Sequence, residues 1–555
     1  MPSNSFDPIP LRSTTEGQVP EGHLPPGTRP SPGRRPSREA WLGKRKQAVE
    51  ARDDAAVEET SQSTSMPSGP DHPVIRHFRH RVERFTNDGR ATGRLTGIDA
   101  ARGLAMVGMV AIHTLPELNE KTGRPTMNWN LFSGHASALF AVLAGVTISL
   151  LSGGNNPHTG DRMQQTRIML GTRALVLLLF GLTLNFMDFS AHNILLYYGL
   201  YFLLVIPFTT MTSGQLFVMG GFCAIFGPLA IQATRLVTVI DPSPNPSLEQ
   251  AVSDPIGTVL ALFALGTYPA FTWLTFIFIG MGIGRLQLTR EKTQTKLVFY
   301  GLTIALTSSI ASQMLLYQFG GLEAIQRANA SMSSDNIQSI IDFGGGNDQL
   351  ETTMWWLVIP TPHSNTTFSV LISGGIAIAL IGVFLMLGKQ KVVPLALLAD
   401  IGSMTLTLFT LHLTFLSIVD VDARPVLWFI TQIGVAISIA AIWKRIWKRG
   451  PLEYIVTTVC GNTARILQPK VASLLRRGGA SGDEAQREGL DGAGSESDED
   501  MEDAEELIPS IESVFLPALH DVNTTMQYKQ GKNINRASHI RLFGQPVHTT
   551  HYKKK

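Results

Sequence analysis

A cation and an imidazole on one helix face are the part of this sequence that could do chemistry. Arg102 and His113 stand eleven residues apart in the apolar run 98–115. At about 100° per residue, eleven residues make three turns plus about 20°, so both side chains leave the same face, about 16 Å apart along the axis. An ionisable group in a membrane helix costs roughly 2.5–3.5 kcal/mol and usually faces a bundle interior or wet cavity. We therefore predict that both face one interior passage.

A less demanding interpretation is open for the same residues. Asp99 precedes Arg102 by three residues, so the two could simply pair near one membrane interface. His113 would then lie at the headgroup level of the opposite interface. The two interpretations differ in whether these side chains face a shared passage.

Arginines gather at the predicted cytosolic end of the bundle, where Arg102 lies. Arg173 falls early in the third apolar run and Arg285 closes the sixth. A guanidinium binds phosphate through a fixed donor fork, so an arginine-lined mouth suits a phosphate-bearing cytosolic ligand. We predict Arg102, Arg173 and Arg285 as contacts of a coenzyme A donor. For Arg285, an ordinary positive-inside charge is the favoured alternative.

Histidines gather at the opposite end. His412 lies in the outer part of the ninth apolar run and His363 precedes the eighth, while His135 and His192 open the second and fourth. Imidazole takes and returns a proton near neutral pH, so this cluster suits proton transfer. We predict an enzyme that passes an activated group from cytosolic coenzyme A to a hydroxyl or amine outside. The alternative is that these histidines are only interfacial residues. The predicted catalytic residues are His113, Arg102, His363 and His412.

The sequence offers little for metal or serine chemistry. Its two cysteines, Cys223 and Cys460, exclude a disulfide framework and a four-thiolate metal site. The histidines could bind zinc, but none shows HExxH spacing, so no metal is expected. Ser137 and Ser364 lack the GxSxG context of a nucleophile elbow, and Ser137 suits close helix packing instead.

Apolar runs of about 18 residues or more predict the transmembrane helices. A further run, 256–266, is too short to cross and precedes Pro269, so we expect a half-helix or re-entrant piece there. The predicted fold class is all-α, a polytopic membrane helix bundle of about ten spans. The predicted spans are 98–115, 131–152, 168–187, 193–211, 214–233, 269–287, 296–318, 367–388, 400–420 and 425–447.

Charge placement predicts the orientation of the bundle. Lys and Arg concentrate in the loops on one side, and acidic residues dominate the loops on the other, so both termini are predicted to be cytoplasmic. The longest outer loop, 319–366, carries Trp355 and Trp356, which suit an interfacial aromatic belt. We expect a multi-pass protein of the plasma membrane.

The apolar part is flanked by polar tails. We predict a disordered cytoplasmic tail over 1–93 with a basic juxtamembrane segment at 77–85, a transmembrane acyltransferase-like domain over 94–462, and a disordered cytoplasmic tail over 463–555. The formal net charge of +2 gives no argument for nucleic acid as a partner. Membrane lipid is the expected partner, and a homodimer is left open.

Several motifs resemble known membrane acyltransferases. Arg102 followed by His113 resembles the Arg-x10-His signature that opens the first helix of the acyltransferase-3 family. The wider pattern, over about 94–455, resembles the heparan-alpha-glucosaminide N-acetyltransferase family and the YeiB-like (DUF418) group. These families are similar in being transmembrane acyltransferases that use acetyl-CoA from inside and modify carbohydrate outside. The motifs are Ser137–Gly145, Ile194–Gly199, Gly266–Pro269, Gly284–Arg285, Pro362–Ser364, Met404–His412 and Gly450–Glu453.

The resemblance implies transfer of an acetyl or other small acyl group from acyl-CoA to a sugar hydroxyl or amine of an envelope glycan or glycolipid. His113 would be the catalytic base or acyl acceptor, with Arg102 its partner or a coenzyme contact. One departure concerns the loop after the first span: in the heparan acetyltransferase the catalytic His precedes a Trp-Asn pair, and here Trp129-Asn130 has Thr126 at that offset. The alternative from another class is a proton-coupled permease or flippase with His113 as a proton relay.

Overall fold

The computed structural model describes residues 95–488, apart from 239, 241, 345–351, 391 and 448, and only the backbone of 470–488. The predicted tail 1–93, with its basic segment 77–85, lies outside the described residues, as does the chain beyond 488. Helix α19 continues to Glu488, past residue 463 where the second tail was predicted to begin.

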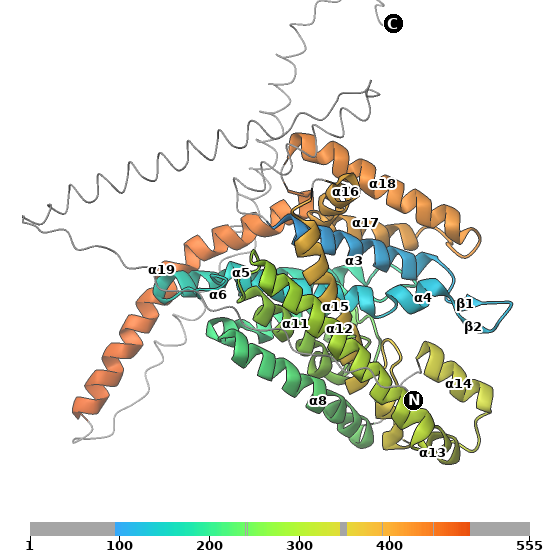
Figure 1. Ribbon diagram of the computed structural model, residues 1–555. Helices are drawn as coiled ribbons and strands as arrows, with labels where there is room; N and C mark the ends of the chain where they lie inside the picture. The colour runs from blue at the N-terminus through green and yellow to red at the C-terminus, as the bar shows by residue number, and fades with distance from the viewer. Residues whose placement is uncertain are drawn as a thin grey trace, which may run out of the picture. The chain divides into compact units, whose positions relative to one another are not determined.

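The described chain is almost entirely helical (Figure 1). One small hairpin, β1 (Leu118–Asn119) paired antiparallel with β2 (Arg124–Pro125), lies between α3 and α4. The helices are α3 (Thr96–Thr114), α4 (Met127–Phe132), α5 (His135–Leu151), α6 (Gly160–Leu184), α7 (Ile194–Leu204), α8 (Ser213–Val237), α9 (Leu248–Ser253), α10 (Pro255–Leu260), α11 (Ala270–Gly284), α12 (Glu291–Gln313), α13 (Gly321–Ala328), α14 (Ser334–Phe343), α15 (Thr367–Leu387), α16 (Val393–Gly402), α17 (Thr405–Leu416), α18 (Pro425–Ile446) and α19 (Pro451–Glu488). Short 3-10 or π segments are η1 (Ile206–Thr210), η2 (Ala261–Leu265), η3 (Met314–Gln318) and η5 (Met354–Val358).

The predicted fold class, an all-α polytopic membrane bundle, is confirmed. Within the described residues, six helices are long and apolar enough to cross a membrane, or up to eight if each of two bent pairs is one span. The two other predicted spans correspond to α3, which carries Asp99 and Arg102, and to α7, which has only 11 residues. The number ten and the cytoplasmic position of both termini therefore stay predictions.

Two predicted spans differ in shape from single straight helices. The predicted span 400–420 is broken, because α16 and α17 meet at a bend of 78°. The predicted span 193–211 ends its α-helix at Leu204 and continues as η1, where Pro207 cannot donate to a helical ladder. The short helical piece predicted over 256–266 is confirmed: α10 and η2 precede α11 at a bend of 53°.

Close contact between helix backbones holds the bundle together. Gly145 of α5 and Gly280 of α11 face each other, and a Cβ on either would lie 2.2 Å or less from a backbone carbonyl oxygen of the other helix. In the same way a Cβ on Gly402 of α16 would overlap the carbonyl oxygen of Asp99. Lipid tails are as apolar as the helices, so no hydrophobic effect drives helices together in a membrane. They associate instead through close packing, which small residues allow. These contacts fix α3, the helix of Arg102 and His113, against α16.

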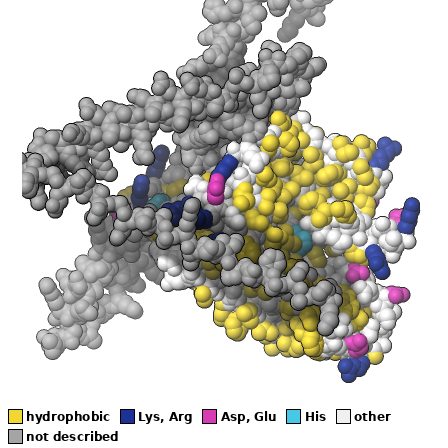
Figure 2. All heavy atoms as spheres, in the orientation of Figure 1, with side chains coloured by type: hydrophobic (Ala, Val, Ile, Leu, Met, Phe, Trp, Pro, Cys, Tyr) yellow, Lys and Arg dark blue, Asp and Glu magenta, His cyan; other side chains and the backbone are white. Residues whose placement is uncertain are grey.

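The outer faces of several helices are apolar, as expected for contact with lipid. Figure 2 shows hydrophobic side chains over much of the described surface in that view, with charged side chains near its edges. Exposed apolar side chains lie along α8, α12 and α18, where soluble proteins would carry polar groups. They include Val218, Phe222, Ile225, Phe299, Leu306, Ile310, Val426, Ile430 and Ile442.

A small helical unit lies in the predicted outer loop 319–366. Helices α13 and α14 with η5 enclose their own hydrophobic cluster, in which Trp356 is fully buried. The prediction that Trp356 belongs to an interfacial belt is wrong, because its indole packs inside this cluster and donates to Thr352 Oγ1 at 3.0 Å. The unit contacts α4, since Trp129 Nε1 donates to the carbonyl of Asp342 in α14 at 3.3 Å.

Candidate active site

Two of the predicted catalytic histidines are in direct contact. Nδ1 of His113, at the end of α3, lies 3.0 Å from Nε2 of His412 on α17. The other ring nitrogen of His412 lies 2.6 Å from Oε1 of Gln432 on α18. Gln432 in turn donates through Nε2 to Thr114 Oγ1 at 3.1 Å, so the chain of contacts returns to α3. Three helices thus hold one hydrogen-bonded relay.

The hydrogen bonds of the relay determine which ring nitrogen of His113 and of His412 carries the proton when both rings are neutral. With its amide nitrogen donating to Thr114, Gln432 can only accept through its oxygen, so Nδ1 of His412 carries a proton. Nε2 of His412 is then an acceptor, and Nδ1 of His113 donates to it. This leaves Nε2 of His113 as the basic nitrogen. A fixed second hydrogen bond of this kind is how proteins orient a catalytic imidazole.

His113 lines a small cavity that it shares with two other histidines. His192 and His363 also line this cavity, whose volume is about 20 Å³. A space of that size holds about one water molecule. The cavity therefore brings His113, His192 and His363 around one point, with His412 directly behind His113. We call it the histidine cavity.

An unusual backbone presents His363 to the histidine cavity. His363 and Asn365 both have positive φ angles, 59° and 56°, which few residues other than glycine adopt. Asn365 Oδ1 accepts a hydrogen bond of 2.8 Å from Trp273 Nε1, which pins the turn to α11. Desolvation of the ring, with smaller contributions from the nearby His192 and His135, lowers the pKa of His363 to about 3. His363 is therefore a neutral base at physiological pH.

His135 has a different position from the other histidines. Its Nδ1 lies 2.9 Å from Ser373 Oγ, which ties the start of α5 to α15. The residues beside it, Gly134 and Ala136, line the histidine cavity, but His135 does not.

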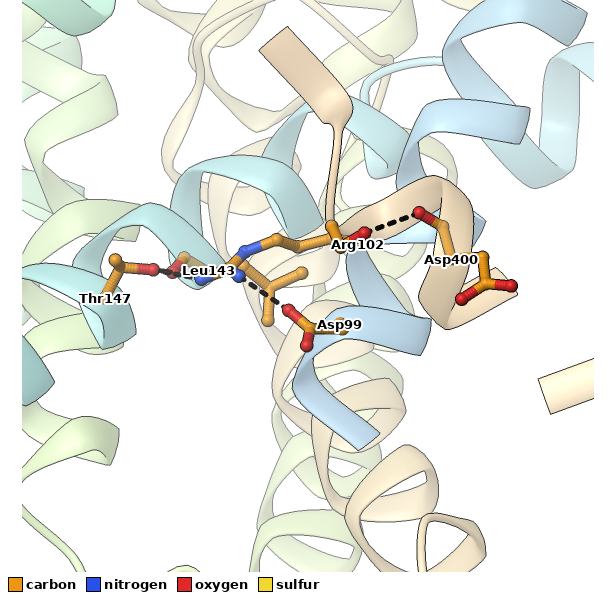
Figure 3. Close-up of polar contacts among 6 residues, drawn as sticks. Asp99, Arg102, Leu143, Thr147 and Asp400 are labelled. Carbon is orange, nitrogen blue, oxygen red and sulfur yellow. Dashed lines mark hydrogen bonds and ion pairs between the residues drawn. The ribbon is translucent and has the colours of Figure 1, made fainter. Parts of the chain in front are cut away.

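Arg102 lies about three turns along α3 from His113, as its spacing predicts. Its guanidinium donates to Asp99 Oδ1 at 3.1 Å and contacts Thr147 of α5 (Figure 3). Figure 3 shows the side chain reaching from α3 to α5 between these two partners. Both interpretations of the sequence hold in part, since Arg102 pairs with Asp99 and also lines an interior cavity.

Arg102 and Arg173 line the same interior space. Two adjoining cavities, of about 590 and 180 Å³, share Asp99, Arg102, Thr147 and Arg173 as lining residues. We call this space the arginine cavity. The guanidinium of Arg173 lies over the ring of Phe202, 5.9 Å from its centroid. Among the described residues no carboxylate pairs with Arg173, so its charge is available to an anionic ligand.

Helix α19 completes the arginine cavity. Arg449, just before this helix, and Thr457 and Cys460 within it are lining residues. Glu453 holds α19 in place, because its carboxylate accepts from the backbone amides of Leu406 and Thr407 at 2.7 and 3.2 Å. These are free amides at the first turn of α17, where an anion is stabilising. The break between α16 and α17 is thereby capped by a residue from another helix.

The structure does not bring Arg285 together with Arg102 and Arg173. Its guanidinium is buried and donates to the carbonyl of Gly154 at 2.7 Å and to Ser152 Oγ at 3.0 Å, and it also contacts the carbonyl of Thr209. These bonds join the end of α11 to the loop after α5 and to η1. Arg285 therefore has a structural role in this geometry, which neither the predicted coenzyme contact nor the positive-inside alternative describes.

The sequence interpretation gave no site role to four residues: Gln432, Thr147, Glu453 and Arg449. Gln432 was detectable, since it is a lone amide in the apolar run 425–447. Thr147 gave no signal, because threonine commonly bonds its own helix backbone. Among the described residues no group of three or more His, Cys, Asp or Glu side chains has a geometry that could hold a metal ion.

A family comparison bears on this pair of cavities. Residues 94–318 match the family model described as heparan-alpha-glucosaminide N-acetyltransferase, catalytic. The matched segment covers α3 to α12 and includes Arg102, His113 and Arg173. The predicted resemblance to this family of transmembrane acetyltransferases is thereby confirmed, while His363, His412 and Gln432 lie beyond the match. No curated protein matches the chain in sequence.

Proposed function

We propose that this protein is a membrane-embedded acyltransferase that moves an acetyl or other small acyl group from cytosolic acyl-CoA to a sugar hydroxyl or amine. The acceptor is a glycan or glycolipid of the cell envelope, reached on the outer side of the plasma membrane. One observation carries the proposal: the arginine cavity and the histidine cavity adjoin, because Met109, Ile194 and Phe409 line both. A donor held by guanidinium groups can thus bring its thioester toward the basic nitrogen of His113.

The relay supports direct transfer with His113 as the general base. Nε2 of His113 takes the proton from the acceptor hydroxyl or amine as that group attacks the thioester carbonyl carbon. The new acyl bond forms, the carbon–sulfur bond breaks, and the coenzyme thiolate leaves with the proton returned by His113. The imidazolium that forms in between donates through Nδ1 to His412, whose own orientation is fixed by Gln432.

The arginine cavity supports an anionic donor. Arg102 and Arg173 supply guanidinium forks suited to phosphate, and Arg449 adds a third at the cavity wall. Asp99 pairs with Arg102 and Glu453 accepts from backbone amides, and because three lining arginines outnumber these two carboxylates, the lining has a net positive charge. The apolar part of the cavity, lined by Phe140 and Leu177, suits the uncharged arm of the coenzyme.

The test is acetyl transfer by the purified full-length protein in detergent, with acetyl-CoA as donor and glucosamine as the probe acceptor. We expect His113→Ala to abolish release of free coenzyme A thiol while leaving binding of coenzyme A intact. Arg102→Ala should weaken that binding. A wild-type protein that neither binds coenzyme A nor acetylates glucosamine or an envelope extract would overturn the proposal and favour the permease alternative.

A further inference from the structure

Three buried apolar residues lie between the arginine cavity and the histidine cavity. Met109, Ile194 and Phe409 line both cavities and are 5%, 2% and 3% exposed. We call them the partition residues. They lie on three separate helices, α3, α7 and α17. Together they form a constriction between the two cavities.

Two of the partition residues lie next to a histidine of the outer cluster. Met109 precedes His113 by four residues on α3, and Phe409 precedes His412 by three on α17, so each pair shares a helix face. The ring centroids of Phe409 and His412 are 6.2 Å apart. The partition residues thus form the layer directly beneath the relay. A group that approaches His113 from Arg102 must pass this layer.

Beyond the partition residues there is little room. The histidine cavity measures about 20 Å³, against about 180 Å³ for the nearer part of the arginine cavity. A carbonyl carbon that reaches His113 must carry its acyl chain into this narrow end. Interiors packed by side chains from several helices resist even one extra methylene.

From this geometry we infer that the partition residues select the donor by acyl length: they admit acetyl and reject longer linear chains. The inference rests on the proposed acyl transfer and adds the donor class to it. Phe409 is the principal determinant, because it has the largest side chain of the three and borders both cavities. A hydrophobic site discriminates about tenfold or more for each methylene that it cannot accommodate.

The test compares acetyl-CoA, butanoyl-CoA and hexanoyl-CoA as donors, with glucosamine as the probe acceptor and kcat/KM as the readout. For the wild type we expect at least about a tenfold fall from acetyl to butanoyl. Phe409→Ala should reduce that preference to threefold or less and make hexanoyl transfer measurable. Phe278→Ala is the matched control: it removes the same ring from a similarly buried residue that packs against Phe208 and lines neither the histidine cavity nor the arginine cavity. It should keep the wild-type preference.

Failure of the inference and failure of the proposed function give different results. A wild type that transfers no acyl group at all would overturn the proposed function, and the inference with it. A wild type that transfers all three chains equally would overturn the inference alone. The same holds if acetyl transfer persists but Phe409→Ala keeps the wild-type preference. Ile194→Ala serves as a second variant, so that poor folding of one substitution leaves the other to decide.

Discussion

His113 and His412 stand 299 residues apart in the chain, yet their rings are nearly parallel, with centroids 5.2 Å apart and an interplanar angle of 9°. This angle and the 3.0 Å contact between ring nitrogens fit a hydrogen bond between the edges of the two rings. The pair joins α3, which also carries Arg102, to α17, whose first turn is capped by Glu453 at the arginine cavity. Helices α3 and α17 therefore each extend from one cavity to the other.

Gln432 provides a direct test of the relay. The substitution Gln432→Leu removes the acceptor for Nδ1 of His412. The His412 ring is then free to change tautomer. A hydrogen bond of this type contributes about 1.4 kcal/mol, so kcat for acetyl transfer should fall about tenfold while KM for acetyl-CoA stays unchanged. Gln432→Glu, which still offers an acceptor oxygen, should recover much of the rate. Equal losses in both variants would contradict a relay through His412.

The sequence was most informative about position along a helix. Arg102 and His113 line two adjoining cavities because helical geometry fixes their separation, and Arg173 lies with Arg102 as His412 lies with His113. The contact between His113 and His412 could not be predicted, since hydropathy gives no information about which helices are neighbours. The same limit hid the position of Arg285, whose carbonyl partners lie more than 70 residues away in sequence.

The break between α16 and α17 shows another limit of the sequence. An apolar run over 400–420 predicts one span, because hydropathy averages over the run and does not detect a bend. The bend is stable because Glu453, about 50 residues later, satisfies the exposed amides of α17. In the same way Trp356 was assigned to the membrane interface because tryptophan is common there, whereas packing within α13 and α14 buries it.

Arg285 and Arg173 should respond differently to the same substitution. Arg285→Gln removes donors from several buried carbonyls, so we expect a loss of at least about 2 kcal/mol in stability and a lower Tm in detergent. Affinity for coenzyme A should hardly change. Arg173→Gln should instead reduce that affinity about tenfold with a small effect on Tm, because its charge has no carboxylate partner among the described residues. An equal fall in coenzyme A affinity in both variants would instead support the predicted contact between Arg285 and the donor.

The proposed orientation can be tested with single cysteines in a background without Cys223 and Cys460. Ser331→Cys places a thiol at an exposed position between α13 and α14, and we expect it to react with an impermeant reagent on intact cells. Thr295→Cys, exposed near the start of α12, is the matched position on the other side and should react only after lysis. The reverse result would exchange the donor and acceptor sides.

The low pKa of His363 predicts how stability depends on pH. Its pKa is about 3 in the folded protein and 6.5 in an unfolded chain, so between these values only the unfolded state binds the proton. Stability should therefore fall as pH drops below 6.5, by at most about 1.4 kcal/mol per pH unit from this group, and be unaffected by it above 6.5. His363→Asn removes the titration and keeps a residue that tolerates positive φ. Its Tm in detergent should drop less than that of the wild type between pH 7 and pH 5. Parallel Tm curves for the two proteins would show that His363 is solvated and not held neutral at the histidine cavity.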